Sequence, residues 1–273
     1  MNQNISKMKT HSSTYWKNYF SQNSKIKRVD WNLKPEITNE EREKILKSLQ
    51  AWQLGETSEG EHLLHASGKY AKAIGDDEYP NAVKLFIQEE QKHGNNLGRY
   101  LDLIAEPRIK KDWGDTLFRK IRYWNTNMEL WTIAVITVES AAQIFYQALK
   151  DATNCTLLKQ ICTDILIDEA AHITFQKERL YIIFSQKNTF SKHITYHAYS
   201  CFYTCTSIVV WLAHRKLFKA GKLSFSRYFN KMKFKLGKVA GKPVLFEPNG
   251  SKNLETEQPT SCVKSLASID LNS

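Results

Sequence analysis

The amino-acid sequence predicts an all-α protein: a four-helix bundle with a long crossover between its second and third helices, followed by additional C-terminal helices. Apolar residues recur at the 3.6-residue spacing of amphipathic helices along most of the chain. Glycine and proline are sparse, at 11 and 6 of 273 residues, and no Asn-Gly pair separates two alternating apolar runs as in a β-hairpin. A chain of this length with 42% apolar residues can bury one sizeable core.

The first two bundle helices have clear start and stop signals. Thr38 opens a typical N-terminal signal, and the apolar pattern predicts one unbroken helix from there to about Ala73. Gly75 ends this helix. Pro80 suits the first turn of a second helix, which is expected to run to about Ile104.

The other two bundle helices follow a long connection. Residues 105–125, with a short helix expected at 116–123, are enough to travel the length of a bundle rather than make a tight turn. The third helix is expected at 127–150 and the fourth at 157–184.

Composition divides the chain into four parts. Residues 1–37 form an N-terminal extension, residues 38–186 the bundle, and residues 187–245 an apolar helix followed by a basic amphipathic segment. Residues 246–273 are rich in Ser, Thr, Asn and Glu with few large apolar groups, which is typical of a disordered tail.

The positive charge is concentrated in the third part. The net charge is +11, and the segment from Lys187 to Phe246 alone contains ten lysines, two arginines and no acid. The rest of the chain is close to neutral, which argues against nucleic acid as the partner. Because the cations of residues 214–238 interleave with apolar residues, we expect an anionic membrane surface or an acidic carrier protein. The uncharged residues 194–213 fit a buried helix, an interfacial helix or a membrane span.

The sequence also predicts a cellular location. Residues 1–10 are polar and contain no apolar run, so no secretory signal peptide is expected. The five cysteines are odd in number and form no C-x-x-C pair, which predicts reduced thiols rather than a disulfide framework or a zinc ribbon. We therefore expect a cytoplasmic protein that is peripheral to the inner face of the membrane.

Two short strings point to metal chemistry. Glu90 and His93 lie on the second expected helix, and Glu169 and His172 on the fourth, each pair as Glu-x-x-His. Residues i and i+3 of a helix share a face, so each string can offer a carboxylate and an imidazole to one metal ion. Both pairs are in phase with the apolar face of their helix, where an unpaired carboxylate is costly. Two such buried strings predict a metal site, although one alone is a weak signal.

The other two helices each supply a further acid in the same phase. On the third helix this acid is Glu139, and the candidates on the first helix are Glu56, Glu59 and Glu61. Glu59 lies 31 residues before Glu90, nearly the separation of the acids on the third and fourth helices, whereas Glu56 lies 34 residues before it. Helical hairpins of equal length bring such residues level across a bundle, so Glu59 is preferred. The predicted ligands are Glu59, Glu90, His93, Glu139, Glu169 and His172.

The second helix resembles a known family motif. The string from Glu89 to Gly94, Glu-Glu-Gln-Lys-His-Gly, is followed by Leu97 and Tyr100 and is similar to the second-helix motif of soluble acyl-carrier-protein desaturases. Those enzymes belong to the ferritin-like di-iron carboxylate superfamily, and the resemblance covers about residues 53–184.

The fourth helix extends this resemblance. The string from Asp168 to His172 is similar to the fourth-helix motif of the desaturases and of bacterial multicomponent monooxygenases. It departs from the desaturase pattern at Ala170 and Ala171, where a basic residue usually precedes the histidine. The resemblance implies that the acids before the two ligand glutamates, Glu89 and Asp168, orient the ligand histidines. The alternative is that both are solvated helix acids.

These observations predict a di-iron protein, with manganese possible on ligand type. The resemblance implies that dioxygen and an external electron donor serve to oxidise or oxygenate an organic substrate, lipidic or carrier-bound. Tyr70 and Tyr146 share the phase of the ligands and are expected as core aromatics or as the lining of a cavity. Two alternatives remain: a non-catalytic protein that binds, stores or senses iron, and a membrane-associated scaffold that binds no metal.

Overall fold

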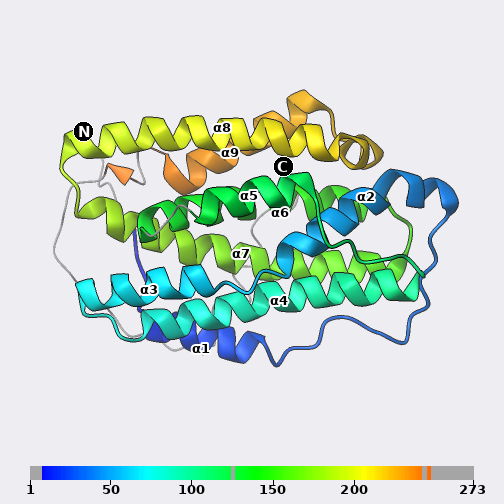
Figure 1. Ribbon diagram of the computed structural model, residues 1–273, viewed down its shortest axis with the longest axis horizontal. Coiled ribbons are helices and arrows are strands. Elements are labelled where there is room, and N and C mark those ends of the chain that lie inside the picture. The colour runs from blue at the N-terminus through cyan, green and yellow to red at the C-terminus, as the bar shows by residue number, and fades with distance from the viewer. Residues whose placement is uncertain (1–7, 124–126, 242–244, 247–273) are drawn as a thin grey trace, which may run out of the picture.

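In the computed structural model, residues 8–123, 127–241 and 245–246 are described, and this part of the chain is all-α (Figure 1). Its nine helices are α1 (Ser13–Asn23), α2 (Asn39–Glu56), α3 (Glu61–Ile74), α4 (Tyr79–Leu103), α5 (Trp113–Tyr123), α6 (Met128–Asp151), α7 (Thr156–Ser185), α8 (Thr189–Ala220) and α9 (Phe225–Ala240). The expected fold class is confirmed.

The bundle consists of α4, α6, α7 and the pair α2 and α3, which together replace one long helix. Helices α2 and α3 both pack on α4, and α6 packs along α7. The connection between α4 and α6 contains α5 and forms the expected crossover. Thr38 caps α2 as expected, because its side chain accepts from the Glu41 backbone amide while the Glu41 carboxylate accepts from the Thr38 amide.

The prediction of one unbroken helix up to Ala73 is wrong. Helix α2 ends at Glu56, and α3 begins only at Glu61. Gly60 precedes α3 with a φ of +69°, a left-handed conformation that favours glycine. The break lies close to α4, because a β-carbon on Gly94 would be 2.8 Å from the Thr57 side chain and 3.1 Å from the Glu56 carbonyl carbon.

Helix α1 was not predicted and is an integral part of the bundle. Trp16 and Phe20 are buried, and both rings pack against Phe175 of α7. Phe20 also packs against Phe86 of α4. The N-terminal extension therefore contributes to the same apolar core as the bundle helices.

Helices α8 and α9 form an outer layer (Figure 1). Helix α8, which contains residues 194–213, packs on α2, α6 and α9 along one side and leaves its other side exposed. Among the described helices, only α6 is long and apolar enough to span a membrane, and 72% of that stretch is buried inside the protein. The expected tail at 246–273 lies outside the described residues except for Phe246.

Candidate metal centre

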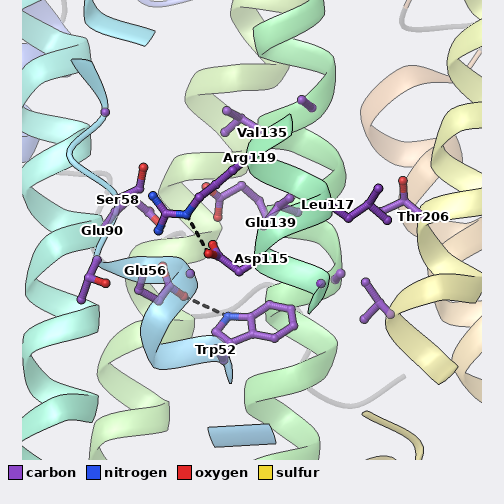
Figure 2. A pocket seen from close by; sticks show the side chains of 18 of the residues that line it. Trp52, Glu56, Ser58, Glu90, Asp115, Leu117, Arg119, Val135, Glu139 and Thr206 are labelled. Carbon is purple, nitrogen blue, oxygen red and sulfur yellow. Dashed lines mark hydrogen bonds and ion pairs between the residues drawn. The ribbon is translucent and has the colours of Figure 1, made fainter. Parts of the chain in front are cut away.

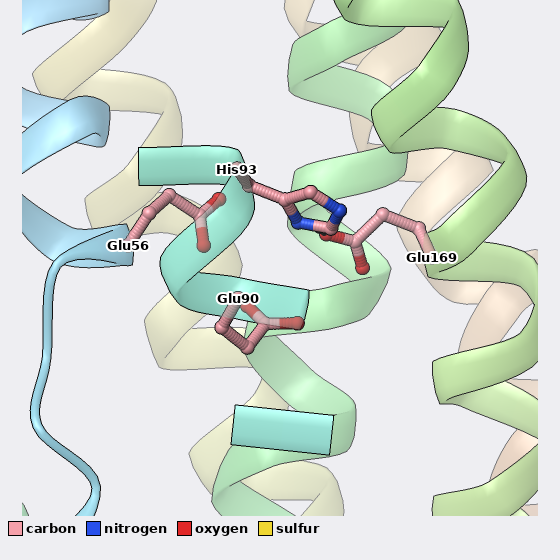
Figure 3. A group of neighbouring side chains, drawn as sticks. All are labelled: Glu56, Glu90, His93 and Glu169. Atoms are coloured by element: carbon pink, nitrogen blue, oxygen red, sulfur yellow. Dashed lines mark ion pairs between the residues drawn. The ribbon is translucent and has the colours of Figure 1, made fainter. Parts of the chain in front are cut away.

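Six carboxylate and imidazole side chains from four helices converge inside the bundle. They form two overlapping groups: Glu56, Glu90, His93 and Glu169, and then Glu90, Glu139, Glu169 and His172. Within each group, one ligand atom per residue lies within 4.8 Å of all the others, and Figure 3 shows the first group. Glu90 and Glu169 belong to both groups, so each could contribute to the binding of both metal ions.

Five of the six predicted ligands are brought together, but the sixth is Glu56 rather than Glu59. Glu56 lies in the last turn of α2 and is buried, whereas Glu59 is exposed in the loop between α2 and α3. Residues 57–60 are not helical, so equal separation along the sequence does not bring Glu59 level with Glu90. Glu59 instead lines the pocket beside the cluster.

The cluster leaves buried polar atoms without hydrogen-bond partners. These atoms are Nδ1 of His93 and His172, both carboxylate oxygens of Glu169, Oε1 of Glu90 and Oε2 of Glu139. His172 Nδ1 lies 2.7 Å from Glu90 Oε1, yet neither atom makes a hydrogen bond. Buried polar atoms are rarely left unsatisfied, and lone pairs that converge in this way fit a pair of divalent cations.

Each histidine is held by the acid of the opposite motif. His93 Nε2 lies 3.0 Å from Asp168 Oδ2, and His172 Nε2 lies 2.9 Å from Glu89 Oε2. Both acids are buried, unlike solvated helix acids. When Nε2 donates to the carboxylate, the lone pair of Nδ1 faces the cluster and is free for a metal ion.

Asn23 and Arg28 of the N-terminal segment, together with Lys92 of α4, hold the two acids behind the histidines. The side-chain amide of Asn23 donates to Glu89 at 2.7 Å and to Asp168 at 2.8 Å. Arg28 Nη1 donates to Asp168 at 2.9 Å, and Lys92 Nζ donates to its other oxygen at 2.6 Å. Burial would raise the pKa of Asp168, but the hydrogen bond with His93 and the charge of Lys92 outweigh it and hold the pKa below its usual value. No sequence pattern indicated Asn23 or Arg28, because their contacts join distant parts of the chain.

Without metal, the cluster concentrates negative charge in a buried place. Burial and the charge of Glu90 raise the pKa of Glu56 to about 8. Burial also raises the pKa of Glu139. For His172, burial opposes protonation, but the charge of Glu90, the nearby carboxylate of Glu139 and the hydrogen bond with Glu89 raise its pKa well above the ordinary value. Two divalent cations would neutralise this surplus of carboxylates.

The two tyrosines predicted as core aromatics or cavity lining have different positions. Tyr146 is buried, and its hydroxyl donates to Glu56 Oε1 at 2.6 Å, an atom that also accepts from Trp52 Nε1 at 3.0 Å. Tyr70 packs instead on the ring of Tyr79, and the charge of Arg179 lies over it. Neither tyrosine is among the residues that line the pocket described below.

A pocket of about 690 Å³ adjoins the cluster (Figure 2). Glu56, Glu90 and Glu139 line it from the bundle, while α5 and α8 contribute the facing wall. Much of this wall is apolar and includes Leu117, Phe202, Val209 and Val210. Among the described residues that line the pocket, Arg119 is the only lysine or arginine, and its Nε donates to Asp115 at 2.7 Å.

The fold is a ferritin-like helical bundle, and the cluster is a carboxylate and histidine site that could hold two metal ions. Three solved structures of R2-like ligand-binding oxidase variants are similar in fold, two with an aerobically and one with an anaerobically reconstituted Mn/Fe cofactor. They have TM-scores of 0.55 to 0.56 and 14–15% sequence identity, and the alignments cover 85% of this chain and 93–94% of theirs. No protein-family model and no curated protein matches the sequence. At this identity, the likeness establishes the fold alone.

Proposed function

We propose that this protein is a dimetal oxidoreductase that activates dioxygen to oxidise or oxygenate an organic substrate. One observation carries the proposal: three acids of the cluster, Glu56, Glu90 and Glu139, also line a pocket large enough for an organic molecule. A site that only stored or sensed iron would need no such cavity beside the metals.

The donor set suits two iron ions. Carboxylate oxygens and imidazole nitrogens bind iron and manganese alike, so manganese at one position is also compatible. The Mn/Fe cofactor of the similar oxidases supports this second composition. When bound, the metals supply the electrons that reduce dioxygen, and an external electron donor restores them.

The surrounding residues fix the site before any metal binds. Asp168 and Glu89 orient the two histidines, while Tyr146 and Trp52 hold the Glu56 carboxylate. Preorganised ligands of this kind lower the cost of assembling a metal site.

The pocket suggests the character of the substrate. Its apolar wall from α5 and α8 would exclude water and hold an apolar body. A lipidic or carrier-bound substrate fits this description. The sequence motifs similar to desaturases support it, although the structures that share the fold are described as oxidases.

Metal content and oxygen uptake test the proposal. Protein purified with ferrous iron should hold two metal ions per chain, one for each group of ligands, and should consume dioxygen in repeated cycles with a chemical reductant. Glu139→Ala and His172→Ala should lose metal, whereas the control Glu59→Ala should keep both ions because Glu59 is exposed outside the cluster. Absence of stoichiometric metal in the parent protein would refute the proposal, and accumulation of iron without repeated oxygen uptake would favour a store.

A further inference from the structure

Helix α8 presents an apolar stripe to the outside of the protein. Between Lys192 and Arg215 it has no lysine, arginine, aspartate or glutamate. Its exposed residues include Ile194, Ala198, Cys201, Cys205, Ile208 and Leu212, which recur every three or four positions and therefore share one face. Leu212 is 58% exposed and Ile194 56%. The exposed face of a surface helix is usually charged, so this stripe indicates a surface that another phase or molecule covers.

Exposed cations continue from this stripe onto α9. Arg215, Lys216 and Lys219 are exposed in the last turns of α8. On α9, Arg227, Lys233 and Lys238 are exposed beside two exposed aromatic residues, Phe225 and Phe234. Helices α8 and α9 pack on each other, so stripe and cations belong to one outer layer (Figure 1).

We propose that this layer, formed by the exposed faces of α8 and α9, is a docking surface for an anionic membrane. A membrane offers an apolar layer for Leu212 and Phe234 and anionic headgroups for the neighbouring cations, and amphipathic helices bind membranes through both. A second copy of the chain fits less well. Residues 187–246 contain no acid, so two such faces would bring cations against cations.

Docking would bring the mouth of the pocket to the lipid. Cys205 and Ala213 of α8 are exposed and also line the pocket, as does exposed Leu117 of α5. Leu117 of α5 and Thr206 of α8 both line the pocket (Figure 2), so the two helices share its wall. This step rests on the proposed function, because only a substrate-binding pocket gains from such an opening. The docking surface itself does not depend on it.

Sedimentation of the full chain with vesicles tests the proposal. Vesicles of mixed phosphatidylglycerol and phosphatidylcholine should bind the protein, and vesicles of phosphatidylcholine alone should bind it much more weakly. Each cation near an anionic surface contributes roughly a fivefold factor to binding. The triple variant Arg227→Glu, Lys233→Glu and Lys238→Glu should therefore bind anionic vesicles roughly a hundredfold more weakly.

Matched controls separate this surface from net charge. Lys69→Glu, Lys72→Glu and Lys84→Glu change the charge equally at exposed sites of α3 and α4, and this triple variant should bind nearly as the parent does. Leu212→Ser with Phe234→Ser should weaken binding several-fold, unlike Leu130→Ser, which removes an exposed leucine from α6. Circular dichroism and thermal melting check that each variant folds. If the basic triple variant does not fold, the Leu212→Ser and Phe234→Ser double variant still tests the proposal.

The proposal would be overturned by equal binding to neutral and anionic vesicles, by equal loss of binding in both charge-reversal triples, or by binding only to an acidic carrier protein. Self-association of the chain through Leu212, seen by sedimentation velocity without vesicle binding, would also overturn it. The variant Glu139→Gln should bind vesicles as the parent does even when it holds no metal. Failure of docking and failure of the proposed function are therefore distinguishable.

Discussion

The Nε2 atom of His93 lies 3.0 Å from the Oδ2 atom of Asp168, which joins two motifs 75 residues apart in the sequence. The acid that precedes Glu169 therefore orients the histidine that follows Glu90, and the relation is reciprocal, because Glu89 contacts His172. The two motifs form one unit in which each is incomplete without the other.

Asp168→Asn should weaken metal binding roughly 10- to 100-fold, because partners behind a ligand histidine fix its tautomer and orientation. Titration of the metal-free protein with ferrous iron measures the change. Asp164→Asn is the matched control, since Asp164 also pairs with Arg28 and Lys92, whereas the hydrogen bond of His93 is with Asp168. Equal loss of affinity in both variants would show that local charge, rather than orientation of His93, controls binding.

Asn23→Ala should destabilise the protein by about 1–3 kcal/mol, because it leaves two buried carboxylates without their shared donor. Urea unfolding of the metal-free protein measures this free energy. Gln22→Ala removes the exposed neighbouring side chain from the same helix and should change stability very little. A small effect of Asn23→Ala would mean that Arg28 and Lys92 suffice to hold the acids in place.

The metal-free protein should lose stability as the pH rises from about 5 to about 8. Glu56 has its pKa raised to about 8 in the folded state, from 4.5, so the folded protein binds more protons than the unfolded chain in this window. The raised pKa of His172 acts in the same direction. Asp168, whose pKa is lowered, contributes stability that is lost only as the pH falls below its ordinary value of 3.8.

Urea unfolding at pH 5.5 and at pH 8 checks this sign. Glu56→Gln should reduce the slope with pH, because the amide does not titrate. Bound metal should reverse the slope, since metal binding displaces the same protons and is favoured as the pH rises. A metal-free protein that is more stable at pH 8 than at pH 5.5 would contradict the raised pKa values of Glu56 and His172.

Sequence periodicity predicted most of the helices and five of the six clustered residues. Amphipathic helices repeat over many turns, so Glu139 or His172 is in phase with its helix regardless of small errors at the ends. The preference for Glu59 over Glu56 did not allow for four residues without helical structure, which change the phase; Gly60 is a local signal of that change. Tyr70 and Tyr146 also share the phase of the ligands, but neither lines the pocket.

The supporting residues could not be predicted in the same way. Asn23 and Arg28 reach Asp168 across 145 and 140 residues of sequence, and no local spacing encodes such a contact. The mixed composition of residues 13–23 likewise hid α1, which is stabilised by packing against the bundle rather than by a strong pattern of its own.

Gly94→Ala should lower affinity for the metal ion held by the group that contains Glu56. The new β-carbon would lie 2.8 Å from the Thr57 side chain and 3.1 Å from the Glu56 carbonyl carbon, so the end of α2 must move away from α4 and take the Glu56 carboxylate with it. Gly68→Ala is the control, because a β-carbon there meets nothing within 4 Å and should stabilise α3 by roughly 0.5–1 kcal/mol. Stepwise metal titration should show the first variant losing one ion before the other, while the second keeps both. Parent-like binding of two ions by Gly94→Ala would show that the end of α2 accommodates the β-carbon without displacing the Glu56 carboxylate.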